Sequence, residues 1–152
     1  FFDYTDNLVS LKDIPYGKTF VVFDKDSFKD SQFNAAIEMA ERKGFIPIWS
    51  NECFELWYIL HYELYSSNNG RNAYFDKLKS LLRIDCSYEK FKSEDIYSIV
   101  HTTENLKRAI KFAKKLDSES CKEKTPSKRV PCTQMHILIA EIEKHLGINL
   151  SE

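Results

Sequence analysis

A short run of β-branched and aromatic residues, 19–23, constrains the fold of this chain more than any other segment. After its first residue the run is entirely apolar, which is typical of a strand buried on both faces, as in a parallel sheet. Residues 45–49 resemble a second strand, although Pro47 removes a ladder donor. The segment between them ends before Gly44 and carries an apolar stripe at helical spacing, made of Phe33, Ala36, Ile37 and Ala40. Together the three segments predict a β-α-β unit and an α/β fold with a small parallel sheet flanked by helices.

The remainder of the chain is mainly helical in pattern. Apolar spacing predicts helices over residues 52–65, 74–82, 95–101, 104–117 and 133–146, so the C-terminal half is expected to be α-rich. Residues 118–131 are polar and basic with two prolines, which indicates a surface loop. Because neither an internal repeat nor a second domain is evident, we interpret residues 1–152 as a single domain.

Composition narrows the possible classes of protein. The chain has 43% apolar and 30% charged residues and no apolar stretch near the roughly 20 residues of a membrane span, so we expect a cytoplasmic protein. A net charge of −1 excludes a strongly basic nucleic-acid binder but allows a local basic patch. The four cysteines lack Cys-x-x-Cys spacing, which favours free thiols over a zinc site made of Cys121, Cys132 and His136.

Two acids one residue apart, Asp24 and Asp26, follow the first predicted strand. Side chains alternate along a strand, so both would point to one side if extended geometry persists that far. Open α/β sheets bind ligands at the carboxyl ends of their strands, where paired carboxylates suit Mg²⁺. The alternative is structural, because acids commonly end strands, and Asp26 or Ser27 would cap the following helix. The pattern by itself slightly favours this structural alternative.

Two known motifs share the D-x-D pattern. An EF-hand loop would need other residues at Phe28, Lys29 and Ala35, so a calcium site of that kind is excluded. A phosphatase of the haloacid-dehalogenase type would use Asp24 as nucleophile and Asp26 as acid/base. Its later Lys and later paired acids have no evident counterpart, and the phosphatase stays a second interpretation.

The predicted helix over residues 52–65 places an acid in apolar surroundings. The downstream helical neighbours of Glu55, at positions 58, 59 and 62, are all aromatic or aliphatic. A carboxylate in such surroundings needs a cation or a proton, so we predict a functional role for Glu55 beside the acid pair. His61 lies within the apolar stripe of this helix, where a lone histidine is more often a core residue than a catalytic base.

The predicted helix over residues 104–117 has a lysine-rich outer face that includes Lys111, Lys114 and Lys115. Such a face usually keeps a helix solvated, and Glu119 and Glu123 interrupt the basic patch. Phosphate binding by these lysines is therefore the less favoured of the two interpretations.

Four segments in order, DKDSF, FNAAIEMA, SNECFELWYILHY and PCTQMHILIAEI, resemble the RloB-like family of bacterial abortive-infection proteins over about residues 20–142. That family is considered Toprim-like, so the resemblance implies a Rossmann-like sheet and Mg²⁺-dependent hydrolysis of nucleic-acid phosphodiesters. It also implies that Asp24, Asp26 and Glu55 bind the metal and act in catalysis with His61. The further polar positions carried over by the resemblance, as binding residues, are Asn51 and Glu52.

The resemblance implies a biological setting as well. RloB-like genes lie beside restriction-modification loci and beside an ATPase, which implies a nuclease in phage defence that acts on DNA or RNA, tRNA among them. The non-enzymatic alternative is a binding or regulatory module for the partner ATPase or for a nucleotide. Toprim domains also use a Glu on an early strand, in a segment resembling E-G-x-x-T-E. Since the chain opens FFDYTDN without Met, we expect that segment upstream of residue 1.

Overall fold

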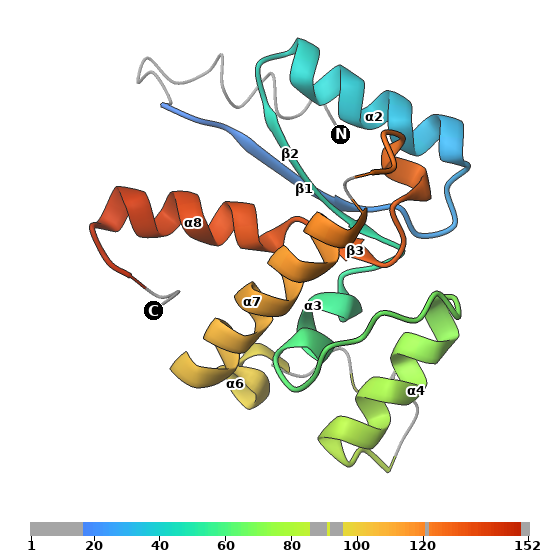
Figure 1. Cartoon of the computed structure of the whole chain (residues 1–152), viewed down its shortest axis with the longest axis vertical. Coiled ribbons are helices and arrows are strands. Elements are labelled where there is room, and N and C mark those ends of the chain that lie inside the picture. The colour runs from blue at the N-terminus through green and yellow to red at the C-terminus, as the bar shows by residue number, and fades with distance from the viewer. Residues whose placement is uncertain (1–16, 86–90, 92–95, 121, 150–152) are drawn as a thin grey trace.

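A three-stranded sheet in the order β1-β2-β3 forms the centre of the computed structural model, which describes residues 17–85, 91, 96–120 and 122–149 (Figure 1). Strand β1 (Phe20–Asp24) pairs in parallel with β2 (Ile46–Asn51). The short strand β3 (Cys132–Thr133) pairs antiparallel with the last two residues of β2. The predicted β-α-β unit and the α/β class are confirmed, and the third strand lies where a loop and a helix were predicted.

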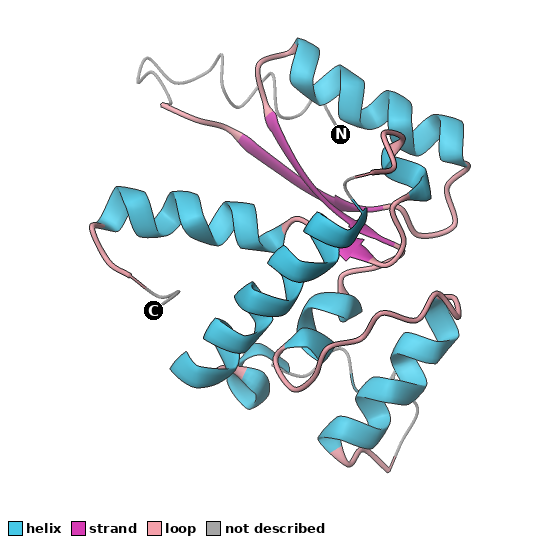
Figure 2. Ribbon diagram, in the orientation of Figure 1, coloured by secondary structure: helices cyan, strands magenta, loops and turns pink. Residues whose placement is uncertain are grey.

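Helices surround this sheet, as Figure 2 shows. Their bounds are α2 Asp30–Arg42, α3 Glu55–Leu60, α4 Arg71–Leu82, α6 Ile96–Val100, α7 Thr103–Ser120 and α8 Met135–Leu146, with a 3₁₀ turn η1 at Pro126–Lys128. Helix α2 ends at Arg42, and Gly44 takes the positive φ of 75° with which the chain turns toward β2. The helical C-terminal half agrees with the sequence-based expectation.

Pro47 fits within β2 because of where its nitrogen faces. The Ile46 N–H donates to the Thr19 carbonyl oxygen (2.8 Å), so by alternation the nitrogen of residue 47 faces away from β1. On that side β3 pairs only with Ser50 and Asn51, and no ladder donor is required at Pro47.

Two sequence-based details are wrong. Strand β1 is not buried on both faces, because Val21 is 2% exposed whereas Val22 is 45% exposed at the edge of the sheet. The helix predicted over residues 52–65 is reduced to α3, and at its start Glu52 instead continues the pairing beyond β2, since its carbonyl oxygen accepts the Asp26 N–H. Pairing with a segment distant in the sequence overrides local helical periodicity here.

Two groups of buried side chains hold the fold together. The larger joins α3, α4, α6 and α7, and its fully buried members include Leu56, Leu60 and Tyr74. The smaller joins α2 to the sheet, where the Phe33 ring meets Trp49 edge to face at 5.6 Å between ring centroids. Helix α3 is thus fixed in the core at the point where β2 ends. Among the described residues, no helix is long and apolar enough to cross a membrane.

We expect Leu56→Ala to lower the free energy of unfolding by about 2–5 kcal/mol, because the side chain is 0% exposed and its removal leaves a cavity. Leu146→Ala is the matched control, since that side chain is 60% exposed. Urea unfolding followed by tryptophan fluorescence measures both. A loss as small as that of the control would contradict the central position of α3.

Candidate functional site

The hydrogen-bond ladder between β1 and β2 continues beyond the strands. The Lys25 N–H donates to the Ser50 carbonyl oxygen (2.9 Å), and the Asp26 N–H donates to the Glu52 carbonyl oxygen (2.8 Å). The D-K-D turn is therefore held against the segment that leads into α3. This arrangement lies at the carboxyl ends of the parallel strands, where ligands of open α/β sheets bind.

Asp24 lies between the sheet and α3. Its Oδ2 accepts a hydrogen bond from the backbone N–H of Phe54 (3.0 Å), one residue before Glu55 begins the helix. Burial, and after it the negative charges of Glu55 and Asp26, raise the pKa of the Asp24 carboxyl to about 6, against the lowering effects of the Phe54 N–H and the Arg71 charge. Asp24, Asp26 and Glu55 are thus close enough to influence one another.

Asp26 does not continue the strand. Its φ of 48° turns the chain out of extended geometry, so strand alternation does not govern where its side chain points. Neither Asp26 nor Ser27 caps α2, because the N-cap residue is Lys29. The predicted capping role of these residues is therefore wrong. Instead, Asp26 Oδ1 forms an ion pair with Nη1 of Arg71, the first residue of α4.

Sequence reasoning missed Arg71. Its position lies 45 residues beyond Asp26 in the chain, and nothing in its local sequence distinguishes it from a solvated surface arginine. Only the packing of α4 beside α3 brings its guanidinium to the acids.

The three acids suit Mg²⁺ in chemistry but do not form a ready-made cage. Within the described part of the chain, no three His, Cys, Asp or Glu side chains are grouped so that they could hold a metal ion together. Carboxylate oxygens are nevertheless the ligands that Mg²⁺ prefers, and Mg²⁺ is commonly bound by one or two carboxylates together with substrate phosphates and water. The described residues therefore supply oxygen ligands of the kind that Mg²⁺ takes, but not a complete set of ligands.

Cys53 lies beside these acids, but its thiol is expected to be unreactive. The thiol is 1% exposed, and burial together with the nearby Glu55 charge raises its pKa far above the usual range. A thiol that stays protonated is a poor nucleophile and a poor metal ligand.

Asn51 and Glu52, predicted as binding residues, contribute to the framework. Asn51 is 0% exposed, and its Nδ2 donates to the carbonyl oxygens of Ser127 (3.0 Å) and Pro126 (3.3 Å). Ser127 is also held by Asn34 of α2, whose Oδ1 accepts its N–H (3.0 Å). Asn51 thereby ties the end of β2 to η1, and the backbone carbonyl of Glu52 anchors the acid turn.

His61 lies in the core at the end of α3 opposite to Glu55. It is 1% exposed, its Nδ1 donates to the Trp57 carbonyl oxygen (2.9 Å), and its ring meets the Trp57 ring edge to face at 5.1 Å. Burial lowers its pKa, which favours the neutral imidazole. The structure does not bring His61 to the acids, in agreement with the core interpretation made from the sequence.

A second group of polar side chains surrounds Asp117. Its Oδ1 pairs with Arg129 and lies 3.5 Å from the Cys132 Sγ, and its Oδ2 lies 3.7 Å from the His136 Nε2. The Arg129 guanidinium supplies the positive charge that a cation would otherwise bring. Cys121, the remaining member of the zinc alternative, lies outside the described residues.

The basic face of α7 borders a hollow of about 600 Å³. Its cationic lining includes Lys107, Lys111 and Lys114, none of which forms an ion pair within the described residues. The Nζ of Lys115 instead lies 3.8 Å from the Oε1 of Glu119, one turn along the helix. Of the three predicted lysines, the structure thus groups Lys111 and Lys114 and adds Lys107.

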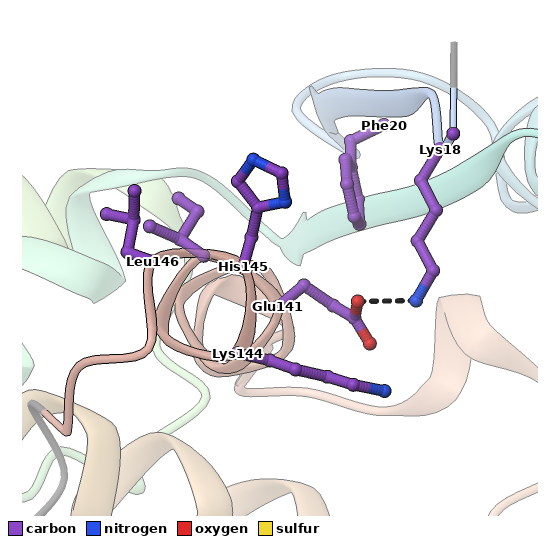
Figure 3. A pocket seen from close by; sticks show the side chains of 8 residues that line it. Lys18, Phe20, Glu141, Lys144, His145 and Leu146 are labelled. Carbon is purple, nitrogen blue, oxygen red and sulfur yellow. Dashed lines mark hydrogen bonds and ion pairs between the residues drawn. The ribbon is translucent and has the colours of Figure 1, made fainter.

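Another hollow, of about 630 Å³, lies between the start of β1 and α8 (Figure 3). Phe20 and Lys18 border it on one side, and Lys18 pairs with Glu141 of α8. Because Phe20 begins β1 and Asp24 ends it, this hollow lies at the end of the strand opposite to the acids.

Most of the chain matches a known protein family. A family model described as RloB-like protein matches residues 4–142. The chain belongs to the RloB-like family. No curated protein and no solved structure matches it. The predicted family is thereby confirmed over most of the chain, and in this RloB-like protein the acid pair and the start of α3 lie together at one end of the sheet.

We expect Asp24→Asn to raise the free energy of unfolding by roughly 1–2 kcal/mol near pH 7.5, without added metal. The folded-state pKa of Asp24 lies above its unfolded value, so the folded protein binds the proton more tightly. Its contribution to stability is therefore present below about pH 4 and is lost as pH rises through about 6. Asparagine removes the charge but still accepts the Phe54 N–H.

Urea unfolding of parent and variant near pH 4.5 and pH 7.5 measures this difference, which should shrink at the lower pH. Asp76→Asn, which changes an exposed acid on α4, is the matched control. Equal destabilisation by Asp24→Asn at both pH values would mean that the hydrogen bond to Phe54 outweighs the burial of the charge.

Proposed function

We propose that this RloB-like protein is a Mg²⁺-dependent nuclease that hydrolyses phosphodiester bonds of DNA or RNA in anti-phage defence. One observation carries the proposal: Asp24 lies at the carboxyl ends of the parallel strands, and burial together with the charges of Glu55 and Asp26 raises its pKa to about 6. The positive charge of Arg71 acts against this shift and lowers the pKa of Asp24. Such an excess of negative charge is unfavourable for stability and is typical of a site for a cation.

The proposed chemistry is hydrolysis at phosphorus. Asp24, Asp26 and Glu55 would hold the metal, which supplies charge neutralisation and a lowered pKa of bound water. A carboxylate of the group accepts a proton from the attacking water, a P–O bond forms, and the opposite P–O bond breaks. The leaving oxygen then takes up a proton. A further Glu from an upstream strand, which the Toprim resemblance implies, would add a ligand.

A non-catalytic role has two specific observations in its favour. Arg71 already neutralises Asp26, and the described residues offer no preformed set of three metal ligands. In this alternative the same surface would bind the partner ATPase or a nucleotide. A phosphatase of the haloacid-dehalogenase type is the other alternative, and it predicts phosphorylation of Asp24 by small phosphomonoesters.

We expect Asp24→Asn to reduce Mg²⁺-dependent cleavage by the full-length protein more than about 100-fold, because the loss of a ligand charge removes several kcal/mol of metal-assisted stabilisation. Labelled DNA, RNA and tRNA serve as substrates, and p-nitrophenyl phosphate tests the phosphatase. Asp76→Asn is the control, and thermal melting establishes that each variant is folded. Undiminished cleavage by a folded Asp24→Asn protein would assign the acids a structural role.

The lysines of α7 supply a surface for the nucleic-acid backbone in this proposal. Lys107, Lys111 and Lys114 are free of ion pairs within the described residues and border one hollow, so their charges are open to phosphates. Because Lys115 forms an ion pair with Glu119, we expect it to contribute less to phosphate binding.

Replacement of Lys107, Lys111 and Lys114 by Gln should weaken nucleic-acid binding for all sequences and flatten the dependence of log affinity on log salt by up to about 2–3 units. Each lysine that neutralises a phosphate contributes a slope of about 0.9 on duplex DNA and about 0.7 on single strands. Fluorescence anisotropy over a salt series measures the slope, with Lys115→Gln as the matched control. An unchanged slope and affinity would exclude this face of α7 from the binding surface.

A further inference from the structure

Arg71 is the cation that pairs with the acid group. It begins α4, and its Nη1 pairs with Asp26 Oδ1 while its charge lowers the pKa of Asp24. The ion pair is not sealed from solvent, since the Arg71 and Asp26 side chains are 39% and 36% exposed. A ligand can therefore reach the guanidinium from outside.

Two further observations describe the surroundings of this guanidinium. Its Cζ lies 5.1 Å from the centroid of the Phe75 ring, one turn along α4, which supports the planar group from one side. Its Nε is buried and has no hydrogen-bond partner among the described residues. A buried donor without a partner is unfavourable, so the pairing of Arg71 with Asp26 leaves one N–H of the guanidinium unused.

We propose that Arg71 binds a phosphate of the nucleic-acid substrate and exchanges Asp26 for that phosphate when a metal ion occupies the acids. The proposal rests on the nuclease function above and adds to it a substrate-binding residue. Without metal, Arg71 neutralises Asp26; with metal, the carboxylate has a stronger cation and the guanidinium is released toward the substrate.

The chemistry of the guanidinium favours phosphate over other ligands. Its planar fork of N–H donors matches two phosphate oxygens, and a charge-assisted pair of this kind is stronger than a neutral hydrogen bond. Gly70, the N-cap of α4, has no side chain to cap the helix, so the positive end of the helix adjoins the same position. Because Arg71 lies beside Asp26, a phosphate bound to it would lie next to the metal ligands.

The first measurement uses Mg²⁺ alone, titrated calorimetrically into the full-length protein. Arg71→Gln should bind Mg²⁺ roughly 3- to 10-fold more tightly than the parent, because a cation that competes for Asp26 is gone. Arg42→Gln, an exposed arginine on α2, is the control and should leave the affinity unchanged. Unchanged or weaker Mg²⁺ binding by a folded Arg71→Gln protein would overturn the exchange of partners.

The second measurement uses labelled duplex DNA and single-stranded RNA with Ca²⁺ in place of Mg²⁺ to slow cleavage. Arg71→Gln should bind the preferred probe about 10-fold or more weakly, whereas Arg71→Lys, which keeps the charge without the fork, should lose less. If Arg71 is only a counter-charge for Asp26, both variants will bind like the parent, and that result would overturn the proposal.

The two measurements separate this proposal from the function on which it rests. A parent protein that binds neither Mg²⁺ nor the probes would remove the nuclease function itself. A parent that binds both, with an Arg71→Gln variant of parental probe affinity, would remove the role of Arg71 alone. If Arg71→Gln does not fold, Arg71→Lys tests the proposal instead, because it keeps a cation beside Asp26. The proposal then still requires that Arg71→Lys bind the probe more weakly than the parent.

Discussion

The hydrogen bond from the Phe54 N–H to the Asp24 carboxylate is the contact on which the arrangement of the candidate site depends. It fastens the end of β1 to the start of α3, and the bond from the Asp26 N–H to the Glu52 carbonyl extends the same ladder. Leu56 and Leu60 bury α3 in the larger core, so the acids at the strand ends are attached to a helix that is fixed in place. One side-chain and two backbone hydrogen bonds therefore hold the turn that carries both aspartates.

The buried negative charges at this end of the sheet destabilise the folded protein. Burial and two neighbouring carboxylates raise the pKa of Asp24, and Arg71 offsets only part of the negative charge. A protein under selection for stability alone would pair or replace such acids, as it does around Asp117, where Arg129 completes the charge balance. The unbalanced acids therefore support a function that needs them ionised near a cation.

Two basic features are compatible with the proposed nuclease. Arg71 lies directly at the acids, and the lysines of α7 border a separate hollow, so one would act on the phosphate beside the metal and the others on the flanking backbone. Membership of the RloB-like family fits this account without naming a substrate. The near-zero net charge is compatible with it, because binding depends on where the positive charges gather and not on their sum.

The sequence by itself determined the β-α-β unit, the acids at the end of β1 and the apolar stripe of α3, because these follow from the order of neighbouring residues. A functional role for Glu55 was predicted in the same way, from the absence of a cation at helical spacing. Only the tertiary structure decided that Arg71 pairs with Asp26, that Asn51 ties β2 to η1, and that Glu52 bonds to the acid turn where a helix was expected. Each of these depends on segments that are distant in the chain and become neighbours through core packing, which local periodicity does not encode.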